Sequence, residues 1–206
     1  YKVSNLSFKQ EAQTKFTNVN FEIKKGQWLG VKGAIGSGKS TLMELLLGLR
    51  DDYQGSILLY GKEISSYSMS ELRGSISYVP QKNFLFADTI KNNIALSNDI
   101  SGDKIEDYLQ QVDIKEDVSL FKNTYNTLLG EWGVNLSGGQ KQRLSIARAL
   151  AQNKNILILD DCLSAVDTVT EEKILQMLKE KYKDTTIIWV AHRDSTLRYC
   201  EQVIEL

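Results

Sequence analysis

The sequence contains very little proline, cysteine and histidine. Its 206 residues include one proline, Pro80, two cysteines, Cys162 and Cys200, and one histidine, His192. A single proline excludes a proline-rich linker, and no low-complexity segment or internal repeat divides the chain, so we expect one domain. The cysteines lack the spacing of a metal site or a redox motif, and we expect two buried thiols in a reducing compartment.

A long apolar run and an excess of one charge are also absent. The longest apolar run lies near 42–49, far short of the roughly 20 residues that a membrane-spanning helix needs. The 25 basic and 26 acidic residues leave a net charge of -1, which gives no support to a broad nucleic-acid-binding surface. These values are typical of a soluble globular protein.

The sequence begins without a methionine and ends within an expected strand. No signal peptide and no methionine precede Tyr1, and the chain ends on the expected strand 203–206. We expect the sequence to be part of a longer polypeptide, with any membrane domain outside it.

Two kinds of strand are present, separated by a segment rich in helix signals. Apolar and polar residues alternate in three segments that predict antiparallel strands, 1–8, 16–23 and 55–61. The segments 155–160 and 185–191 are almost wholly apolar, and an amphipathic helix over 168–182 lies between them. This arrangement predicts a parallel sheet covered on both faces. Ser68 and Glu71 form a predicted capping box.

The stretch GAIGSGKST, from Gly33 to Thr41, matches the phosphate-loop pattern G-x-x-x-x-G-K-[ST]. It follows an expected strand and precedes an expected helix, as phosphate binding requires, because glycines let backbone N–H groups face phosphate oxygens. Lys39 is expected to reach the outer phosphates and Ser40 to hold Mg²⁺. The alternative is a glycine-rich turn. The predicted nucleotide-binding residues here are Gly33, Gly36, Ser37, Gly38, Lys39, Ser40 and Thr41.

Asp160 ends the apolar strand ILILD. In P-loop nucleotidases an acid at this place orients Mg²⁺, often through water. We therefore expect Asp160 to be a magnesium-binding residue, and the alternative is a carboxylate that only caps the strand end.

The segment LSGGQ, Leu136 to Gln140, distinguishes one family among the P-loop proteins. With the phosphate loop, the glutamine of YVPQ, ILILD, SAVD and AHR in this order, the chain resembles the nucleotide-binding domain of ATP-binding cassette (ABC) transporters. The resemblance covers nearly the whole chain and implies ATP and Mg²⁺ as ligands. It implies an α/β fold: a P-loop NTPase core with a mainly parallel sheet, an N-terminal antiparallel β-subdomain and a helical subdomain. The expected core is 1–82 and 153–206, and the helical subdomain is about 83–152.

The signature residues open a helix, where small residues and a hydroxyl suit an anion. In the family, each signature closes on ATP held by the other subunit of a head-to-tail dimer, so the resemblance implies a second nucleotide-binding domain as a partner. The alternative is a turn and helix cap. The residues concerned are Ser137, Gly138, Gly139 and Gln140.

Three further residues receive roles from the resemblance. Phe8 matches the aromatic residue that stacks on adenine, usually a tyrosine, and the alternative is a strand residue facing the core. Gln81 matches the hinge glutamine that senses Mg²⁺ and reports to the membrane domain, and the alternative is a plain loop amide. His192 matches the histidine that contacts the outermost phosphate, and the alternative is an ordinary core or surface histidine.

Two stretches favour an exporter over an importer. The segment 81–96 resembles the FLF-x-x-T-I-x-x-N-I segment of exporters, and TLLGEWG, with Glu131 as its acid, resembles their Gly-Glu loop. Both face the coupling helices of the membrane domain in exporters. The resemblance therefore implies a transmembrane partner and a location at the cytoplasmic face of the cell membrane. Trp132 departs from the polar or basic residue that the family more often has.

Asp161 occupies the place where the family normally has a glutamate that activates the attacking water. Its arm is shorter by one C–C bond, roughly 1.5 Å, and a 1 Å misplacement can slow a reaction on the order of 10²-fold. We expect a degenerate site like that of one subunit in heterodimeric exporters, whose partner carries the glutamate. The alternative is that a small backbone shift restores full activity.

Three functions remain open from the sequence. The chain is an exporter's ATPase motor domain, a largely non-hydrolysing regulatory half of a heterodimer, or a soluble ABC ATPase acting on DNA or ribosomes. The third class interrupts the domain with coiled coils or joins two cassettes by a charged linker, and neither feature is visible. The transported substrate, and the choice between homodimer and heterodimer, are left open.

Overall fold

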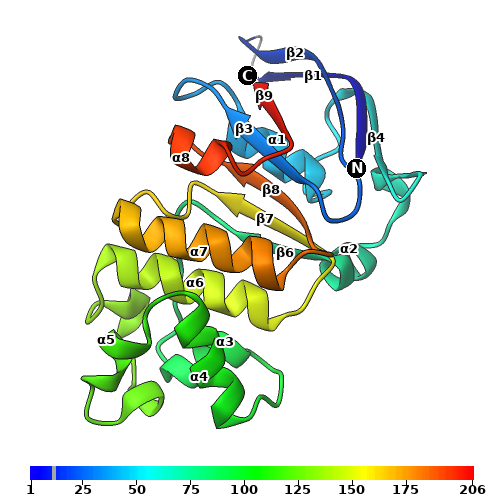
Figure 1. Cartoon of the computed structure of the whole chain (residues 1–206). Coiled ribbons are helices and arrows are strands. Elements are labelled where there is room, and N and C mark those ends of the chain that lie inside the picture. The colour runs from blue at the N-terminus through cyan, green and yellow to red at the C-terminus, as the bar shows by residue number, and fades with distance from the viewer. Residues whose placement is uncertain (11–12) are drawn as a thin grey trace. The chain divides into compact units, whose positions relative to one another are not determined.

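The computed structural model describes residues 1–10 and 13–206. These residues form two compact units (Figure 1). The first unit comprises 1–76, 154–160 and 184–206, and the second comprises 77–153 and 161–183.

The predicted core boundaries differ from this division at 77–82 and Asn153, which lie in the second unit, and in the segment 161–183. The segment was expected with the core, whereas hydrogen bonds join its helix to the second unit. Lys173 donates to Asp113 at 3.0 Å, and the Tyr182 hydroxyl donates to Gln111 at 2.7 Å. The expected helical subdomain, 83–152, lies within the second unit.

The first unit contains an antiparallel sheet in the order β2-β1-β4-β5. Alternation along these strands places one set of side chains in the core, where Val3 pairs with Phe21 on one side and with Ile57 on the other. The strands are β1 (Lys2–Gln10), β2 (Gln13–Glu22), β4 (Gln54–Leu59) and β5 (Lys62–Glu63).

The same unit contains parallel strands in the order β7-β8-β3-β9 (Figure 1). β7 and β8 are buried along their whole length, as their uninterrupted apolar sequences predict. Helix α1 (Lys39–Leu46) contacts β7, and α8 (Asp194–Leu197) connects β8 to β9. The strands are β3 (Trp28–Lys32), β7 (Ile156–Asp160), β8 (Thr186–Val190) and β9 (Gln202–Glu205).

Short elements lead from the first unit to the second. A 3₁₀ turn, η1 (Ile64–Ser66), precedes α2 (Met69–Ser75), and β6 (Ile76–Val79) follows. The predicted capping box is confirmed, because the Ser68 hydroxyl accepts a bond from the Glu71 N–H and the Glu71 carboxylate accepts one from the Ser68 N–H.

The second unit is helical and packs around α6 (Gly138–Ala151). α3 and α4 contact α6, which buries Leu144, Ile146 and Ala147. The other helices are α3 (Ile90–Ala95), α4 (Gly102–Gln111), α5 (Lys115–Ser119), α7 (Thr168–Lys181) and the 3₁₀ turns η2 (Thr124–Asn126) and η3 (Glu131–Gly133).

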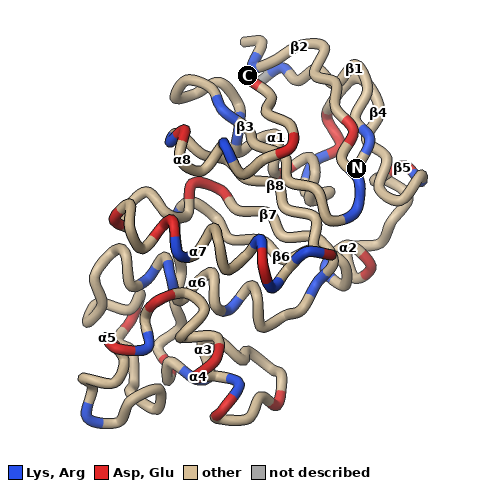
Figure 2. Tube along the Cα trace, in the orientation of Figure 1, with Lys and Arg blue, Asp and Glu red and all other residues tan. Residues whose placement is uncertain are grey.

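Basic and acidic residues are interspersed along the trace of both units (Figure 2). Several form exposed ion pairs, such as Lys2–Glu22 at 3.7 Å and Lys115–Glu106 at 2.9 Å, and pairs of this kind contribute little to stability. Among the described residues, no helix has the length and apolar character needed to cross a membrane. The expected α/β class, with an antiparallel sheet, a parallel sheet and helices, is confirmed.

Candidate functional site

In the first unit, the ends of three parallel strands meet at one edge of the sheet. Asp160, the last residue of β7, pairs in register with Val190 of β8, and Val190 pairs with Val31 of β3. The phosphate loop begins just after β3, and His192 lies two residues beyond Val190. The register therefore brings the loop, Asp160 and His192 to the same edge, where ligands bind in open α/β sheets.

Two glycines let the phosphate loop approach its surroundings closely. Gly33 has φ +154°, and a Cβ atom there would lie 2.4 Å from the carbonyl oxygen of Leu206. Gly38, the N-cap of α1, has φ +102°, and its Cβ would lie 2.9 Å from the Phe16 ring. No other residue type fits these positions without a shift of the backbone or of the ring.

Lys39 is buried and turns its side chain into the loop. Its ammonium group donates to the carbonyl oxygens of Gly33 and Ala34, both at 2.8 Å, which uses two of its three donors. The Ser37 hydroxyl is buried and has no hydrogen-bond partner among the described residues. A buried ammonium group, an unpaired hydroxyl and the first N–H groups of α1 together fit a phosphate group.

The oxygen ligands expected for Mg²⁺ lie in the same unit. Asp160 is only 2% exposed, and Ser40 lies exposed in the first turn of α1. A hydroxyl and a carboxylate are hard ligands of the kind that Mg²⁺ prefers, so the donor set fits this ion. Thr41 is half-buried in the same turn, and His192 is exposed.

The location of Phe8 does not support its expected role. Phe8 is 1% exposed in β1, its ring packs against Phe16 at a centroid distance of 6.0 Å, and the Arg50 guanidinium lies 4.7 Å from its centroid. The ring is therefore enclosed by protein neighbours, and its contact with adenine stays a prediction. The structure makes Phe8 a core residue, the alternative that the sequence left open.

The second unit holds the signature segment at the start of α6. The Ser137 hydroxyl accepts a bond from the Gln140 N–H at 3.2 Å, and the Gln140 side chain accepts one from the Ser137 N–H at 2.9 Å and donates to Asp117. Gly138 and Gly139 form the first turn, and a Cβ on Gly139 would lie 2.8 Å from the Ala165 carbonyl oxygen. The cap leaves the Ser137 hydroxyl hydrogen available to an anion.

Gln81 and Asp161 lie together in the second unit. The Gln81 amide donates to the Asp161 carboxylate at 3.2 Å. Asp161 has φ +47°, an uncommon conformation for a non-glycine residue that aspartate adopts more readily than most. Its carbonyl oxygen accepts a bond from the Ser164 hydroxyl at 3.1 Å.

Gln142 is a functional candidate that the sequence analysis missed. It is buried on α6, donates to the Ser164 hydroxyl at 3.0 Å and accepts from the Ala165 N–H at 2.9 Å. It thereby joins the signature helix to the loop that follows Asp161. The available signal was a polar residue four positions before Ile146, on the buried face of a helix.

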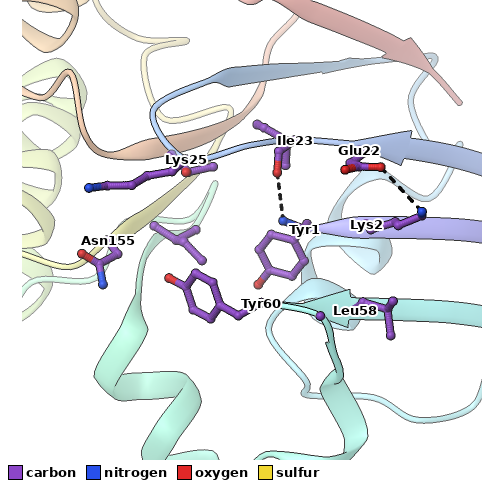
Figure 3. A pocket seen from close by; sticks show the side chains of 11 residues that line it. Tyr1, Lys2, Glu22, Ile23, Lys25, Leu58, Tyr60 and Asn155 are labelled. Atoms are coloured by element: carbon purple, nitrogen blue, oxygen red, sulfur yellow. Dashed lines mark hydrogen bonds and ion pairs between the residues drawn. The ribbon is translucent and has the colours of Figure 1, made fainter.

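The first unit also contains a cavity of about 580 Å³ (Figure 3). The Tyr1 amino group donates to the Ile23 carbonyl oxygen at 3.1 Å, and Lys2 pairs with Glu22. Burial raises the pKa of the Tyr1 phenol, so it stays neutral and donates to the Leu46 carbonyl oxygen. The lining contains none of the predicted site residues: Tyr1, Lys2, Glu22, Ile23, Lys25, Leu58, Tyr60, Gly61, Asn155, Ile156 and Thr186.

Comparisons with known proteins agree with this geometry. A family model described as ABC transporter matches residues 16–164. The multidrug resistance-like ATP-binding protein MdlA of Buchnera aphidicola subsp. Baizongia pistaciae is 43% identical over 205 residues, which are 98% of this chain and 35% of that protein. The probable multidrug resistance ABC transporter ATP-binding/permease protein YheI of Bacillus subtilis is 39% identical over 204 residues, with coverage of 98% and 35%.

A solved structure of a bacterial Atm1-family ABC exporter with ATP bound superposes with a TM-score of 0.94 at 34% identity, covering 100% of this chain and 36% of that one. The chain therefore spans about a third of the length of these relatives. The family match over most of the chain, supported by this superposition, shows that the chain belongs to the ABC transporter family and has the P-loop NTPase fold of its nucleotide-binding domain.

Proposed function

We propose that this chain is the ATP-binding domain of an ABC exporter and that ATP drives its head-to-tail association with a second such domain. The observation that carries the proposal is the phosphate loop, where the Lys39 ammonium and the unpaired Ser37 hydroxyl lie at the strand edge that ends in Asp160. The names of the relatives, which describe export and multidrug resistance proteins, support the direction of transport.

We assign separate tasks to individual residues, as the resemblance to the family implies. Lys39, Ser37, Thr41 and the loop N–H groups bind the phosphates of ATP, and His192 contacts the outermost one. Ser40 and Asp160 hold Mg²⁺, and Gln81 senses it, as the family resemblance implies. When bound, Mg²⁺ neutralises charge that develops on the phosphates.

The signature residues serve the partner chain. Ser137 and the N–H groups of Gly138 and Gly139 stand at the start of α6, where the helix dipole favours an anion. We assign them to ATP held by the second domain. Closing and opening of this pair would reorient membrane helices that lie outside the present chain, at the cytoplasmic face of the membrane.

The site built on this chain is proposed to be slow. Asp161 stands in place of the general base on an arm roughly 1.5 Å shorter than glutamate, and the Gln81 amide holds its carboxylate. This hydrogen bond favours the second candidate function, in which the chain binds ATP durably and regulates a partner whose own site carries glutamate.

Equilibrium binding of radiolabelled ATP tests the phosphate loop. Lys39→Met should lower ATP affinity at least tenfold, because the loop loses its only buried ammonium facing Gly33 and Ala34. Lys32→Met is the matched control, because Lys32 ends the preceding strand but pairs with Glu205 on the surface. The ATP affinity of this variant should equal that of the native chain. Equal affinities in both variants would contradict the proposal.

Turnover separates the two candidate functions. We expect the purified chain alone to hydrolyse ATP slowly, and the mixture with a glutamate-carrying partner to hydrolyse it much faster. Brisk hydrolysis by this chain alone would show a fully competent site and remove the regulatory alternative.

A further inference from the structure

The guanidinium of Arg148, on the signature helix α6, is directed entirely at the segment around α3. It donates through Nε to the Asn93 carbonyl oxygen at 2.8 Å, through Nη2 to Asn93 Oδ1 at 2.6 Å and through Nη1 to the Phe84 carbonyl oxygen at 2.7 Å. It also lies 5.3 Å from the centroid of the Phe86 ring. These acceptors are neutral, and burial lowers the pKa of Arg148 to about 10.

Asn93 continues this contact into the segment 84–89. Its side chain is 1% exposed, accepts from the Phe86 N–H at 2.8 Å and donates to the carbonyl oxygens of Phe86 and Thr89, both at 3.0 Å. The segment has no helix or strand of its own before α3. The buried Asn93 amide therefore holds the backbone of the segment at Phe86 and Thr89, beside the backbone bond from Leu129 to Asp88.

Two exposed rings of the segment, Phe84 and Phe86, form a group with the exposed Trp132 of η3, and we call this group the aromatic surface. Phe84 meets Phe86 edge to face at 4.8 Å and Trp132 edge to face at 4.9 Å. Trp132 is 62% exposed. Edge-to-face contacts favour this mutual arrangement, so a shift of Phe84 changes its contacts with both other rings.

Ser137 and Arg148 belong to the same uninterrupted helix. α6 runs from Gly138 to Ala151 without a kink, so the signature end and Arg148 are separated by about 16 Å of rigid helix. A rigid-body movement of α6 therefore displaces Ser137 and Arg148 together.

We propose that Arg148 and Asn93 are positioning residues that fix the aromatic surface to the signature helix, so that nucleotide contact at Ser137 and partner contact at the aromatic surface move together. The inference rests on the proposed function, which supplies the nucleotide at the signature, and on the family resemblance, which implies a membrane partner at 81–96 and at the Gly-Glu loop that carries Trp132.

The test uses the intact transporter that contains this chain, reconstituted in liposomes, with Arg148→Lys, Asn93→Ser and the double variant. Lysine keeps the charge but loses the planar fork that reaches three acceptors. Asn98→Ser is the matched control, since Asn98 also bonds α6, at Gln152, but lies outside the aromatic segment. Hydrogen exchange of 84–89 and of 137–140 is followed with and without Mg-ATP, together with basal and transport-substrate-stimulated ATP turnover.

Without nucleotide, we expect exchange of 84–89 to accelerate at least tenfold in each single variant and no further in the double variant, because the two residues act as one unit. Mg-ATP should still protect the amides of 137–140 from exchange in the variants. The change that Mg-ATP causes in the exchange rate of 84–89 should be at least fivefold smaller than in the native protein. Basal turnover should stay within twofold, and stimulation should fall at least tenfold. Asn98→Ser should behave like the native protein.

Unchanged exchange of 84–89, or basal and stimulated turnover falling by the same factor, would overturn the inference. If Arg148→Lys does not fold, Asn93→Ser decides by the same readouts. Failure of the proposed function is recognised separately, since the native protein would then show no protection of 137–140 by Mg-ATP, while the nucleotide-free exchange still tests the two positioning residues.

Discussion

At the scale of single residues, Gly38 shows how the two halves of the first unit depend on each other. Its left-handed conformation starts α1, and the space beside its Cα is filled by the Phe16 ring of β2. The antiparallel sheet thus supports the loop that we assign to the phosphates.

Gly38→Ala should lower both stability and ATP affinity. The left-handed conformation costs alanine about 1–2 kcal/mol, and the added methyl group overlaps the Phe16 ring, so the loop must shift. Gly61→Ala is the control: Gly61 has φ +79° but open space around its Cα. Thermal unfolding should detect destabilisation in both variants, whereas ATP affinity should fall only in Gly38→Ala. Unchanged affinity in Gly38→Ala would contradict the support role of Phe16.

Residue roles were only partly predictable from the sequence. Local patterns predicted Lys39, Ser40 and Asp160 as site residues, and the observed register of β3, β8 and β7 brings the ends of these strands to one sheet edge. Phe8 is buried against Phe16 and Arg50, and its contact with adenine stays a prediction, because strand alternation does not tell which face of a sheet a bound ligand can reach. The contact with Arg50, more than 40 residues later in the chain, could not be read from the sequence.

At the scale of elements, α7 begins with an ionised cap. The Asp167 carboxylate accepts bonds from the N–H groups of Thr170 at 3.0 Å and Val169 at 3.1 Å. The backbone bond from Thr170, followed by its hydroxyl, lowers the pKa of Asp167 below its ordinary value of 3.8. The stabilisation is therefore fully present above about pH 3.8 and is lost as pH falls through the lower folded-state pKa.

Asp167→Asn should remove this part of the acid sensitivity. Asparagine caps a helix about as well as aspartate but does not ionise, so the fall in melting temperature between pH 6 and pH 3 should be smaller in the variant than in the native chain. Thermal unfolding at the two pH values measures the difference. Equal falls would mean that the charge of Asp167 contributes nothing to folding.

Gln142 is the element-scale link between α6 and the loop after Asp161. Gln142→Leu keeps the volume but removes both bonds, to Ser164 and from Ala165, and should cost about 1 kcal/mol per bond. Gln142→Glu keeps the acceptor for the Ala165 N–H but buries a carboxylate, so at neutral pH it should destabilise the chain at least as much. Urea unfolding compares the two, and a leucine variant as stable as the native chain would contradict the link.

The sequence predicted most of the helices and strands, but it did not predict which compact unit α7 belongs to. The strands and the Ser68 capping box follow from alternation and local chemistry. The association of α7 with the second unit depends on contacts with Asp113 and Gln111, which lie roughly 60–70 residues earlier in the chain. Such long-range polar contacts leave no periodic signal.

At the scale of the whole molecule, we propose that the chain contributes residues to two different ATP sites. We propose, from the resemblance to the family, that Lys39, Asp160 and Asp161 serve ATP bound by this chain and that Ser137 serves ATP bound by a partner. The central claim is that the shorter arm of Asp161 makes the chain's own site slow.

The most direct test is single-turnover hydrolysis of ATP in the intact transporter, with the partner's general-base glutamate replaced by glutamine so that only this chain's site reacts. We predict slow phosphate release from the native chain and a rate at least tenfold higher in Asp161→Glu, because the longer arm restores the position of the carboxylate. A fast native rate that Asp161→Glu leaves unchanged would contradict the account.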